Sequence, residues 1–292
     1  MKTLAIVSGK GGTGKTSITA SLAVLAKDAV FADCDVDAAD LSLLLDGEVS
    51  ESQQFRASQK AIVDRPLCTQ CGLCDETCHF NAIKEGNINY FLCEGCGVCS
   101  RICPQDAIKM RDVDSGWLCV SHTPYGPLVH AQLEPGEANS GKLVTLVRQT
   151  AEEMARNTDR ELIIIDGPPG TGCPVIASIN GITAALIVTE PSLSAISDMK
   201  RVLSVCKHFG VPTYVCVNQY DLHEGNTHDI MRFCQAEGIE VLGAIPYDRS
   251  VVRALLQRTP VTAFYDSPAS KEIEVLWQRF SERTRLIRSR KD

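Results

Sequence analysis

The segment Gly9–Thr16, which reads GKGGTGKT, constrains the fold of this chain more than any other feature. It fits the pattern G-x-x-x-x-G-K-[ST] and lies between the apolar run Leu4–Val7 and the helix-like run Thr16–Lys27. Glycines allow successive backbone N–H groups to point at one anion, and the start of the following helix adds a favourable dipole. We therefore expect a strand, a phosphate-binding loop and a helix in this order; the alternative is a glycine-rich turn without a ligand.

Short apolar runs alternate with helix-like runs along much of the remaining chain. Strands are predicted at Ala29–Ala32, Leu162–Ile165, Ala184–Thr189, Thr213–Val217 and Val241–Ile245. Helices are predicted at Leu143–Arg156, Ala195–Phe209, His228–Ala236, Ser250–Gln257 and Lys271–Ile287. This alternation is typical of an α/β fold with a doubly wound, mostly parallel sheet.

Eight of the 14 cysteines are confined to residues 68–103. Two runs with the spacing C-x2-C-x2-C-x3-C lie 25 residues apart, and the tail Asn81-Ala82-Ile83 recurs as Asp106-Ala107-Ile108. This is the pattern of bacterial ferredoxins with two 4Fe–4S clusters, in which the fourth cysteine of each run binds the other cluster. Zinc ribbons and redox CxxC pairs are alternatives that fit two runs of four less well. The predicted ligands are Cys68, Cys71, Cys74 and Cys103 for cluster 1, and Cys93, Cys96, Cys99 and Cys78 for cluster 2.

The cysteine-rich segment interrupts the α/β pattern. Residues 1–58 and 111–292 are expected to form a P-loop domain, and residues 59–110 a small inserted ferredoxin-like domain. The stretch Gly116–Val144 is expected to return to the main body as strands or hairpins. His79 stands where the ferredoxin pattern usually has proline, which removes no ligand. The other six cysteines are expected mostly as buried small hydrophobes, and a redox or metal role stays open for Cys34 and Cys173.

Composition and charge exclude several classes of function. A chain of 292 residues with 44% hydrophobic and 22% charged residues can bury a large core. The net charge of −7 gives no reason to expect a surface for nucleic acid. No apolar stretch approaches the ~20 residues of a membrane-spanning helix, and the N-terminus does not have the form of an export signal. We therefore expect a cytoplasmic protein.

A second lysine in the loop, Lys10, makes this segment similar to the deviant Walker A motif of the MinD/ParA group of ATPases. The resemblance implies ATP and Mg²⁺ as cofactors. Lys15 is expected at the β- and γ-phosphates, and the Thr16 hydroxyl on Mg²⁺. In this group the equivalent of Lys10 reaches the partner's phosphates across a dimer, where its charge stabilises the transition state. The loop residues expected around the nucleotide are Gly9, Lys10, Gly11, Gly12, Thr13, Gly14, Lys15, Thr16 and Ser17.

Acidic residues after two predicted strands complete the expected site. Asp35 matches the switch-I aspartate of the MinD/ParA group, which positions or deprotonates the attacking water. Asp166 follows Leu162–Ile165 as in a Walker B motif, and both acids are predicted to bind Mg²⁺. Gly170 lies in a segment similar to switch II and is predicted to donate its N–H to the γ-phosphate. Three nearby acids either share the metal shell or cap and solvate the loop: Asp33, Asp37 and Asp40.

The resemblance covers nearly the whole chain. Asn218 is similar to the adenine contact of the group, and Pro246-Tyr247-Asp248 to the loop that lies against the base. Tyr125–Ala131, followed by Ser140–Val144, looks like the segment after the insert in MinD-like ATPases with an inserted ferredoxin domain. Related cluster carriers use a C-terminal C-x-x-C pair, and no such pair follows Cys103.

The resemblance implies a Mg-ATP-hydrolysing homodimer, or a heterodimer with a paralogue, whose nucleotide state acts on two clusters. The expected partner is a redox or metallocofactor protein, for ATP-gated electron transfer or for assembly of a metal or iron–sulfur cofactor. The alternative is MinD-like spatial positioning with structural or sensory clusters.

The last predicted helix allows two interpretations. Its apolar face is either packed on the sheet, which we favour, or bound to a membrane surface, as a basic amphipathic helix can be. The apolar residues are Ile273, Leu276, Trp277, Phe280 and Ile287, and the basic ones Arg279, Arg283, Arg288, Arg290 and Lys291.

Overall fold

The computed structural model of the protein describes residues 1–135, 137 and 140–286. Its contacts divide the chain into two compact units. Unit 1 consists of Met1–Ser52, Cys119–Ala131 and Gly141–Asp292, and unit 2 of Gln53–Leu118 and Gln132–Ser140. Unit 2 is larger than the segment 59–110 because it also includes the strand ends on either side of the cysteine-rich stretch.

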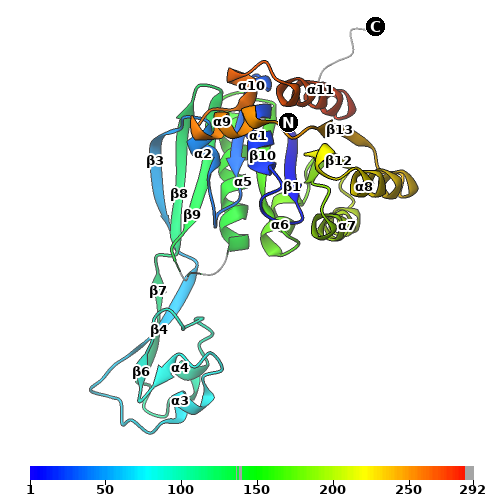
Figure 1. The fold of residues 1–292 in the computed structure, drawn as a ribbon. Coiled ribbons are helices and arrows are strands. Elements are labelled where there is room, and N and C mark those ends of the chain that lie inside the picture. Colours follow the sequence, from blue (N-terminus) through cyan, green and yellow to red (C-terminus); the bar gives the residue numbers. More distant parts are fainter. Residues whose placement is uncertain (136, 138–139, 287–292) are drawn as a thin grey trace. The chain divides into compact units, whose positions relative to one another are not determined.

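The main sheet has nine strands in the order β13-β12-β11-β1-β10-β2-β9-β8-β3. Every neighbouring pair from β13 to β9 is parallel (Figure 1). The prediction of a mostly parallel α/β sheet is therefore confirmed. The strands are β1 (Lys2–Ser8), β2 (Ala29–Asp33), β3 (Glu48–Phe55), β8 (Gly116–Thr123), β9 (Gly126–Leu133), β10 (Leu162–Pro169), β11 (Ala184–Thr189), β12 (Thr213–Asn218) and β13 (Val241–Ile245).

The central strands are buried on both faces, which explains their continuous apolar sequences. All of Leu4–Val7 is fully buried, and β1 lies between β10 and β11. Leu4 and Ile6 pack in the same cluster as Leu22 of α1 (Lys15–Leu25), whereas Val7 flanks Gly167 together with Ser178 of α6 (Cys173–Ile179). Since alternate side chains of a strand point to opposite faces, α1 and α6 cover opposite faces of the sheet.

Two layers of helices follow from this arrangement (Figure 1). With α1 lie α2 (Leu41–Leu44), α10 (Val261–Phe264) and α11 (Pro268–Arg283), and α9 (Arg249–Leu256) packs on α10. With α6 lie α7 (Leu193–His208) and α5 (Ser140–Asn157). The remaining elements of unit 1 are α8 (Glu224–Ala236) and the 3₁₀ turn η1 (Tyr220–Leu222).

Unit 2 contains two short antiparallel pairs of strands and two short helices. β4 (Ser58–Val63) pairs with β7 (Ile108–Val113), and β5 (Ile83–Lys84) with β6 (Asn87–Ile88). The helices are α3 (Leu73–Thr77) and α4 (Val98–Ile102). The 25-residue duplication is visible in the backbone, because equivalent residues share left-handed φ angles: Gln70 (56°) and Gly95 (66°), Gly72 (81°) and Gly97 (74°), Asn81 (51°) and Asp106 (50°).

The last described helix, α11, packs on the sheet. Ser267 caps it through a reciprocal pair of hydrogen bonds with Ser270. Three residues of its apolar face are buried in the core cluster of unit 1, namely Ile273, Leu276 and Phe280. Ile287, Arg288, Arg290 and Lys291, which belong to the predicted amphipathic helix, lie outside the described residues. Among the residues that the structure covers, no helix is both long and apolar enough to cross a membrane.

Gly126, at the turn between β8 and β9, lies close to the backbone of β2, and a substitution can test this close approach. Gly126 has a φ of 145°, and a Cβ there would lie 2.5 Å from the carbonyl oxygen of Ala29 in β2. We expect Gly126→Ala to lower the free energy of unfolding by about 3 kcal/mol, because backbone strain and overpacking add. Urea denaturation followed by circular dichroism measures this.

Gly181→Ala is the matched control for this substitution. Gly181 also has a positive φ, 72°, but a Cβ there would meet nothing within 4 Å. It should therefore cost only the strain of the left-handed backbone, about 1 kcal/mol. Equal losses in the two variants would contradict the close approach at Gly126.

Candidate functional site

The loop between β1 and α1 has the conformation that an anion-binding loop requires. Gly12 and Gly14 have φ angles of 82° and 86°, and Gly14 is the residue before the first turn of α1. A Cβ on Gly14 would lie 2.3 Å from Nδ2 of Asn218, and this contact and the left-handed φ together favour glycine at this position. The N–H of Gly170 donates to the carbonyl oxygen of Ser8 (2.9 Å), which joins the segment after β10 to the start of the loop.

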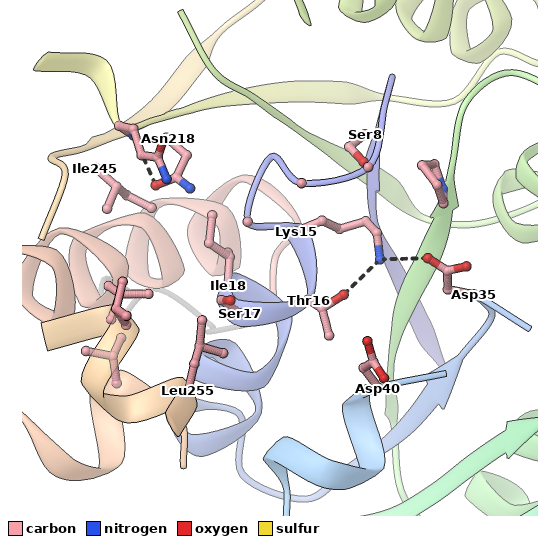
Figure 2. Close-up of a pocket in the computed structure, with 18 of the residues that line it drawn as sticks. Ser8, Lys15, Thr16, Ser17, Ile18, Asp35, Asp40, Asn218, Ile245 and Leu255 are labelled. Carbon is pink, nitrogen blue, oxygen red and sulfur yellow. Dashed lines mark hydrogen bonds and ion pairs between the residues drawn. The ribbon is translucent and has the colours of Figure 1, made fainter. Parts of the chain in front are cut away.

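A cavity of about 660 Å³ opens beside this loop (Figure 2). Its walls come from α1 and the segments that follow β2, β10, β12 and β13. Of the predicted site residues, those that line it are Gly11, Gly12, Gly14, Lys15, Thr16, Ser17, Asp35, Asn218, Pro246 and Asp248. Those outside the lining are Gly9, Lys10, Thr13, Asp166 and Gly170.

Lys15 occupies the centre of the charged network, and its side chain is 6% exposed. Its Nζ lies 2.7 Å from Oδ1 of Asp166, 3.2 Å from the Thr16 hydroxyl and 3.9 Å from Oδ2 of Asp35. Figure 2 shows Lys15 extending toward Thr16 and Asp35. Burial favours the neutral amine, but the charge and hydrogen bond of Asp166 and the charges of nearby carboxylates outweigh it, so the pKa of Lys15 is raised. The side chain is a charged ammonium.

Asp166 is fully buried and has one satisfied and one unsatisfied oxygen. Oδ1 accepts hydrogen bonds from Lys15 and from the hydroxyl of Thr19 (2.9 Å), a residue that the sequence did not single out. Oδ2 of Asp166 and Oγ1 of Thr13 have no hydrogen-bond partner among the described residues. A buried polar atom without a partner costs about 1–3 kcal/mol. These atoms fit a Mg²⁺ ion with its waters and a phosphate, which supply the missing partners.

Two carboxyl groups, Asp33 at the end of β2 and Asp35 just after it, differ in their surroundings. Asp33 is fully buried and accepts N–H bonds from Asp35 (3.1 Å) and Leu41 (3.0 Å), so it caps the loop. Burial and the charge of Asp166 raise the pKa of Asp33 well above its ordinary value. Asp35 lines the cavity, and burial raises its pKa to about 6 against the opposing charge of Lys15. Asp35 is therefore the group poised to exchange a proton.

The segments after β12 and β13 form the far wall of the cavity. Nδ2 of Asn218 donates to the carbonyl oxygen of Thr13 (2.9 Å), which ties β12 to the loop. Asp248 caps α9, since its two oxygens accept the N–H groups of Ser250 (2.8 Å) and Ala269 (3.2 Å). Burial would raise its pKa, but these hydrogen bonds lower the pKa of Asp248 to about 2. Asp248 therefore fixes the loop position.

Lys10 points away from the cavity, toward the start of α7. Its Nζ lies 2.7 Å from Oε1 of Glu190, 3.2 Å from the Ser192 hydroxyl and 3.1 Å from the Ser194 hydroxyl. Sequence reasoning did not name these partners. One signal was available, because Glu190 directly follows the predicted strand Ala184–Thr189, where parallel strands place site residues.

In unit 2, two cavities each bring together four cysteines. Each group takes three cysteines from one run and the fourth from the other run. Backbone N–H groups donate to Sγ of Cys78 (from Ala82, 3.3 Å) and of Cys103 (from Ala107, 3.3 Å), which favours thiolates, the form that binds metal. One cavity is lined by Cys68, Cys71, Cys74 and Cys103, and the other by Cys78, Cys93, Cys96 and Cys99.

None of the 14 cysteines takes part in a disulfide. Cys34 is fully buried, and burial raises the pKa of its thiol, whereas Cys173 is exposed at the start of α6. Over residues 1–135, 137 and 140–286, no three or more His, Cys, Asp or Glu side chains surround a single point at which one metal ion would bind.

The chain belongs to the CobQ/CobB/MinD/ParA nucleotide binding domain family, whose model matches residues 4–261. This confirms the P-loop nucleotide-binding fold. A solved structure with the same fold is the septum site-determining protein MinD complexed with Mg-ADP from Pyrococcus horikoshii, at a TM-score of 0.60 and 19% identity over 98% of each chain.

Two sequence relatives extend this result. The uncharacterized protein MJ0578 of Methanocaldococcus jannaschii is 33% identical over 283 residues, 96% of either chain. An iron-sulfur cluster carrier protein of Pyrococcus horikoshii is 30% identical over 140 residues, which are 44% of this chain and 48% of the carrier. Similarity to this carrier is therefore partial.

The pKa of Asp35 yields a prediction for the nucleotide-free protein. Carboxyl-labelled NMR should find Asp35 titrating at a pH of about 6, protonated below this value and ionised above it. Lys15→Met should raise the pKa further, because it removes the positive charge that favours the carboxylate.

Lys10→Met is the control for the Asp35 titration. The Lys10 ammonium is paired with Glu190, and it is not among the charges that act on Asp35. The pKa of Asp35 should therefore stay unchanged in this variant. A shift of the same size in both variants would contradict the specific role of Lys15.

Proposed function

We propose that the protein is a Mg-ATP-hydrolysing iron–sulfur protein in which nucleotide-driven changes of a dimer act on two 4Fe–4S clusters. In this proposal the segment 59–110 is the core of a ferredoxin-like domain inserted into the ATPase domain. The observation that carries the proposal is the pair of four-cysteine cavities in unit 2. When bound, each 4Fe–4S cluster supplies a centre that gains or loses one electron.

The grouping of the cysteines supports clusters over zinc. A zinc ribbon takes its ligands as two separated C-x2-C pairs. Each cavity here instead takes the first three cysteines of one run and the last of the other, which is the arrangement of two-cluster ferredoxins. Four thiols from this chain at each cavity match complete ligation of one cubane.

The residues of the main cavity support hydrolysis of ATP. Lys15 and the N–H groups of the loop supply positive charge for the phosphates, and Thr16 and Asp166 supply oxygens for Mg²⁺. Asp35, with a pKa of about 6, is suited to orient the attacking water and to accept its proton. Lys10 completes the charge at the γ-phosphate only after it leaves Glu190, and we assign that change to dimer formation.

Electron transfer to a partner protein is the first choice of function, because all four ligands of each cluster come from one chain and hold it firmly. Assembly of an iron–sulfur or other metal cofactor is the second, and the partial similarity to an iron-sulfur cluster carrier protein favours it. Spatial positioning of the MinD kind is supported by the shared fold alone. It is the weakest candidate, because the apolar face of α11 is buried in the core and is not free to bind a membrane surface.

An anaerobic experiment separates these functions. The cluster-loaded protein is mixed with an apo-acceptor and an iron chelator, and cluster absorbance is followed with and without MgATP. Electron transfer predicts that both clusters persist unchanged, whereas assembly predicts that MgATP accelerates their loss. A protein purified anaerobically with zinc instead of iron and sulfide would overturn the cluster proposal.

Substitution of the second loop lysine tests the ATPase role. Lys10→Ala should reduce hydrolysis by about 10³-fold, as loss of an arginine finger does, while ATP binding and iron content stay at wild-type levels. Lys27→Ala, which changes an exposed lysine after α1, should leave hydrolysis unaltered. Normal turnover in Lys10→Ala would refute the role of Lys10 in catalysis.

Single cysteine substitutions test the crossed ligation of the clusters. Cys78→Ser should perturb the same cluster as Cys96→Ser, although these residues belong to different runs. Cys103→Ser should perturb the cluster that Cys71→Ser perturbs. Electron paramagnetic resonance of the reduced protein distinguishes the two. If Cys78→Ser matched Cys71→Ser instead, each run would bind its own cluster.

A further inference from the structure

A buried ion pair in unit 2 lies beside the cavity of Cys78, Cys93, Cys96 and Cys99. Lys60 of β4 has a side chain only 6% exposed, and the side chain of Glu137 is 1% exposed. The Nζ of Lys60 donates to the carbonyl oxygen of Cys93 (2.9 Å) and lies 3.3 Å from Oε1 of Glu137.

Tyr90 contacts both members of this ion pair. Its ring centre lies 4.9 Å from Nζ of Lys60, and its hydroxyl donates to Oε1 of Glu137 (3.0 Å). Oε2 of Glu137 has no hydrogen-bond partner among the described residues. The glutamate therefore keeps an unsatisfied oxygen inside the unit.

A buried pair of this kind is a poor source of stability. The desolvation of each ion costs several kcal/mol, and a well-packed apolar pair of the same size is often as stable or more so. The surrounding core is small, since its buried residues are Ala61, Ala82, Cys93 and Ile108. The presence of a charged lysine here points to a role other than packing.

The backbone that carries Cys93 lies directly on β4. Gly95 has a φ of 66°, and a Cβ there would lie 2.0 Å from the carbonyl oxygen of Gln59. Cys93 itself is 8% exposed. The loop from Cys93 to Gly97 therefore packs directly on β4, the strand that carries Lys60. The Lys60 ammonium donates a hydrogen bond to the carbonyl oxygen of Cys93, the first residue of this loop.

The duplication shows that two charged residues at the cysteine sites are not repeated. A shift of 25 residues maps Lys60 onto Glu85, so the lysine is not repeated in the second half. The same shift maps Asp75 onto Ser100. Oδ1 of Asp75 lies 3.4 Å from Sγ of Cys74, which places a carboxylate against a cysteine of the other cavity.

Resting on the two-cluster function proposed above, we infer that Lys60 is a positioning residue for the Cys78, Cys93, Cys96 and Cys99 site and gives that cluster the higher reduction potential. Reduction adds a negative charge to a cluster. An ammonium beside the site stabilises this charge, and the carboxylate of Asp75 at the other site opposes it.

The orientation of the ion pair determines the sign of its effect. Nζ of Lys60, rather than the Glu137 carboxylate, contacts the Cys93 loop, so the pair presents its positive end to the site. Both side chains are buried, and salt screens buried charges much less than exposed ones. The difference in potential between the clusters should therefore persist at high ionic strength.

Redox titration of the holoprotein, followed by electron paramagnetic resonance, tests this inference with two substitutions of opposite sign. Lys60→Gln should lower the reduction potential of the cluster at the Cys78, Cys93, Cys96 and Cys99 site, because it removes a positive charge. Glu137→Gln should raise the potential of the same cluster, because it removes the opposing negative charge. Both should leave the other cluster unchanged. Lys84→Gln, at an exposed lysine of the same unit, should shift neither cluster.

A merely structural role for the pair gives a different result. Loss of packing would move the potential in the same direction in Lys60→Gln and Glu137→Gln, and that outcome would overturn the inference. If Lys60→Gln does not fold, the double variant Lys60→Gln/Glu137→Gln replaces it. Its potential should fall below that of Glu137→Gln, since it lacks the ammonium, and equality of the two would contradict a charge effect.

The wild-type protein and the two variants together distinguish failure of the inference from failure of the proposed function. A wild-type spectrum without two 4Fe–4S clusters overturns the proposed function. Two clusters whose potentials respond to neither Lys60→Gln nor Glu137→Gln overturn only the role of Lys60.

Discussion

The contact between Lys15 and Asp166 is the interaction on which the nucleotide site depends. It joins the first residue of α1 to Asp166 within β10, across 2.7 Å and almost out of contact with solvent. The order of the strands makes this contact possible, because β10 lies between β1 and β2 in the sheet. Asp166 is consequently in register with Ile6 on one side and Asp33 on the other. Chain segments far apart in sequence thereby assemble one charged centre.

Local sequence patterns predicted the parts of the fold that local physics determines. The buried parallel strands are apolar without interruption, and the loop contains glycines at Gly9 and Gly14, where a Cβ would meet a close neighbour, so both were visible in the sequence. The strand Glu48–Phe55 was not predicted, because seven of its eight residues are exposed and its sequence is mostly polar. Edge strands of this kind are held by their neighbours in the sheet, and no apolar pattern identifies them.

The same limit applies to the partners of the site residues. Lys10, Lys15 and Asp35 were named from their motif, but the residues that set their charge and orientation lie elsewhere in the chain. Glu190 meets Lys10, and Thr19 meets Asp166, only after the sheet has formed. In unit 2 the cysteine spacing predicted two groups of four ligands. The contact of Lys60 with Glu137 instead depends on tertiary structure, and no repeated sequence pattern indicates it.

The two units use buried charge in opposite ways. In the nucleotide site several carboxyl groups surround one lysine. Burial, and after it the negative charge of Asp166, raises the pKa values of Asp33 and Asp35. A bound divalent cation relieves such repulsion, and Oδ2 of Asp166 is left without a protein partner. This excess of carboxyl groups therefore favours entry of a cation. In unit 2 the Lys60–Glu137 pair balances its own charge, is almost closed to solvent and contacts a cysteine loop through its positive end. Such a pair provides a constant field, which suits the tuning of a resident group rather than the capture of an exchanging one.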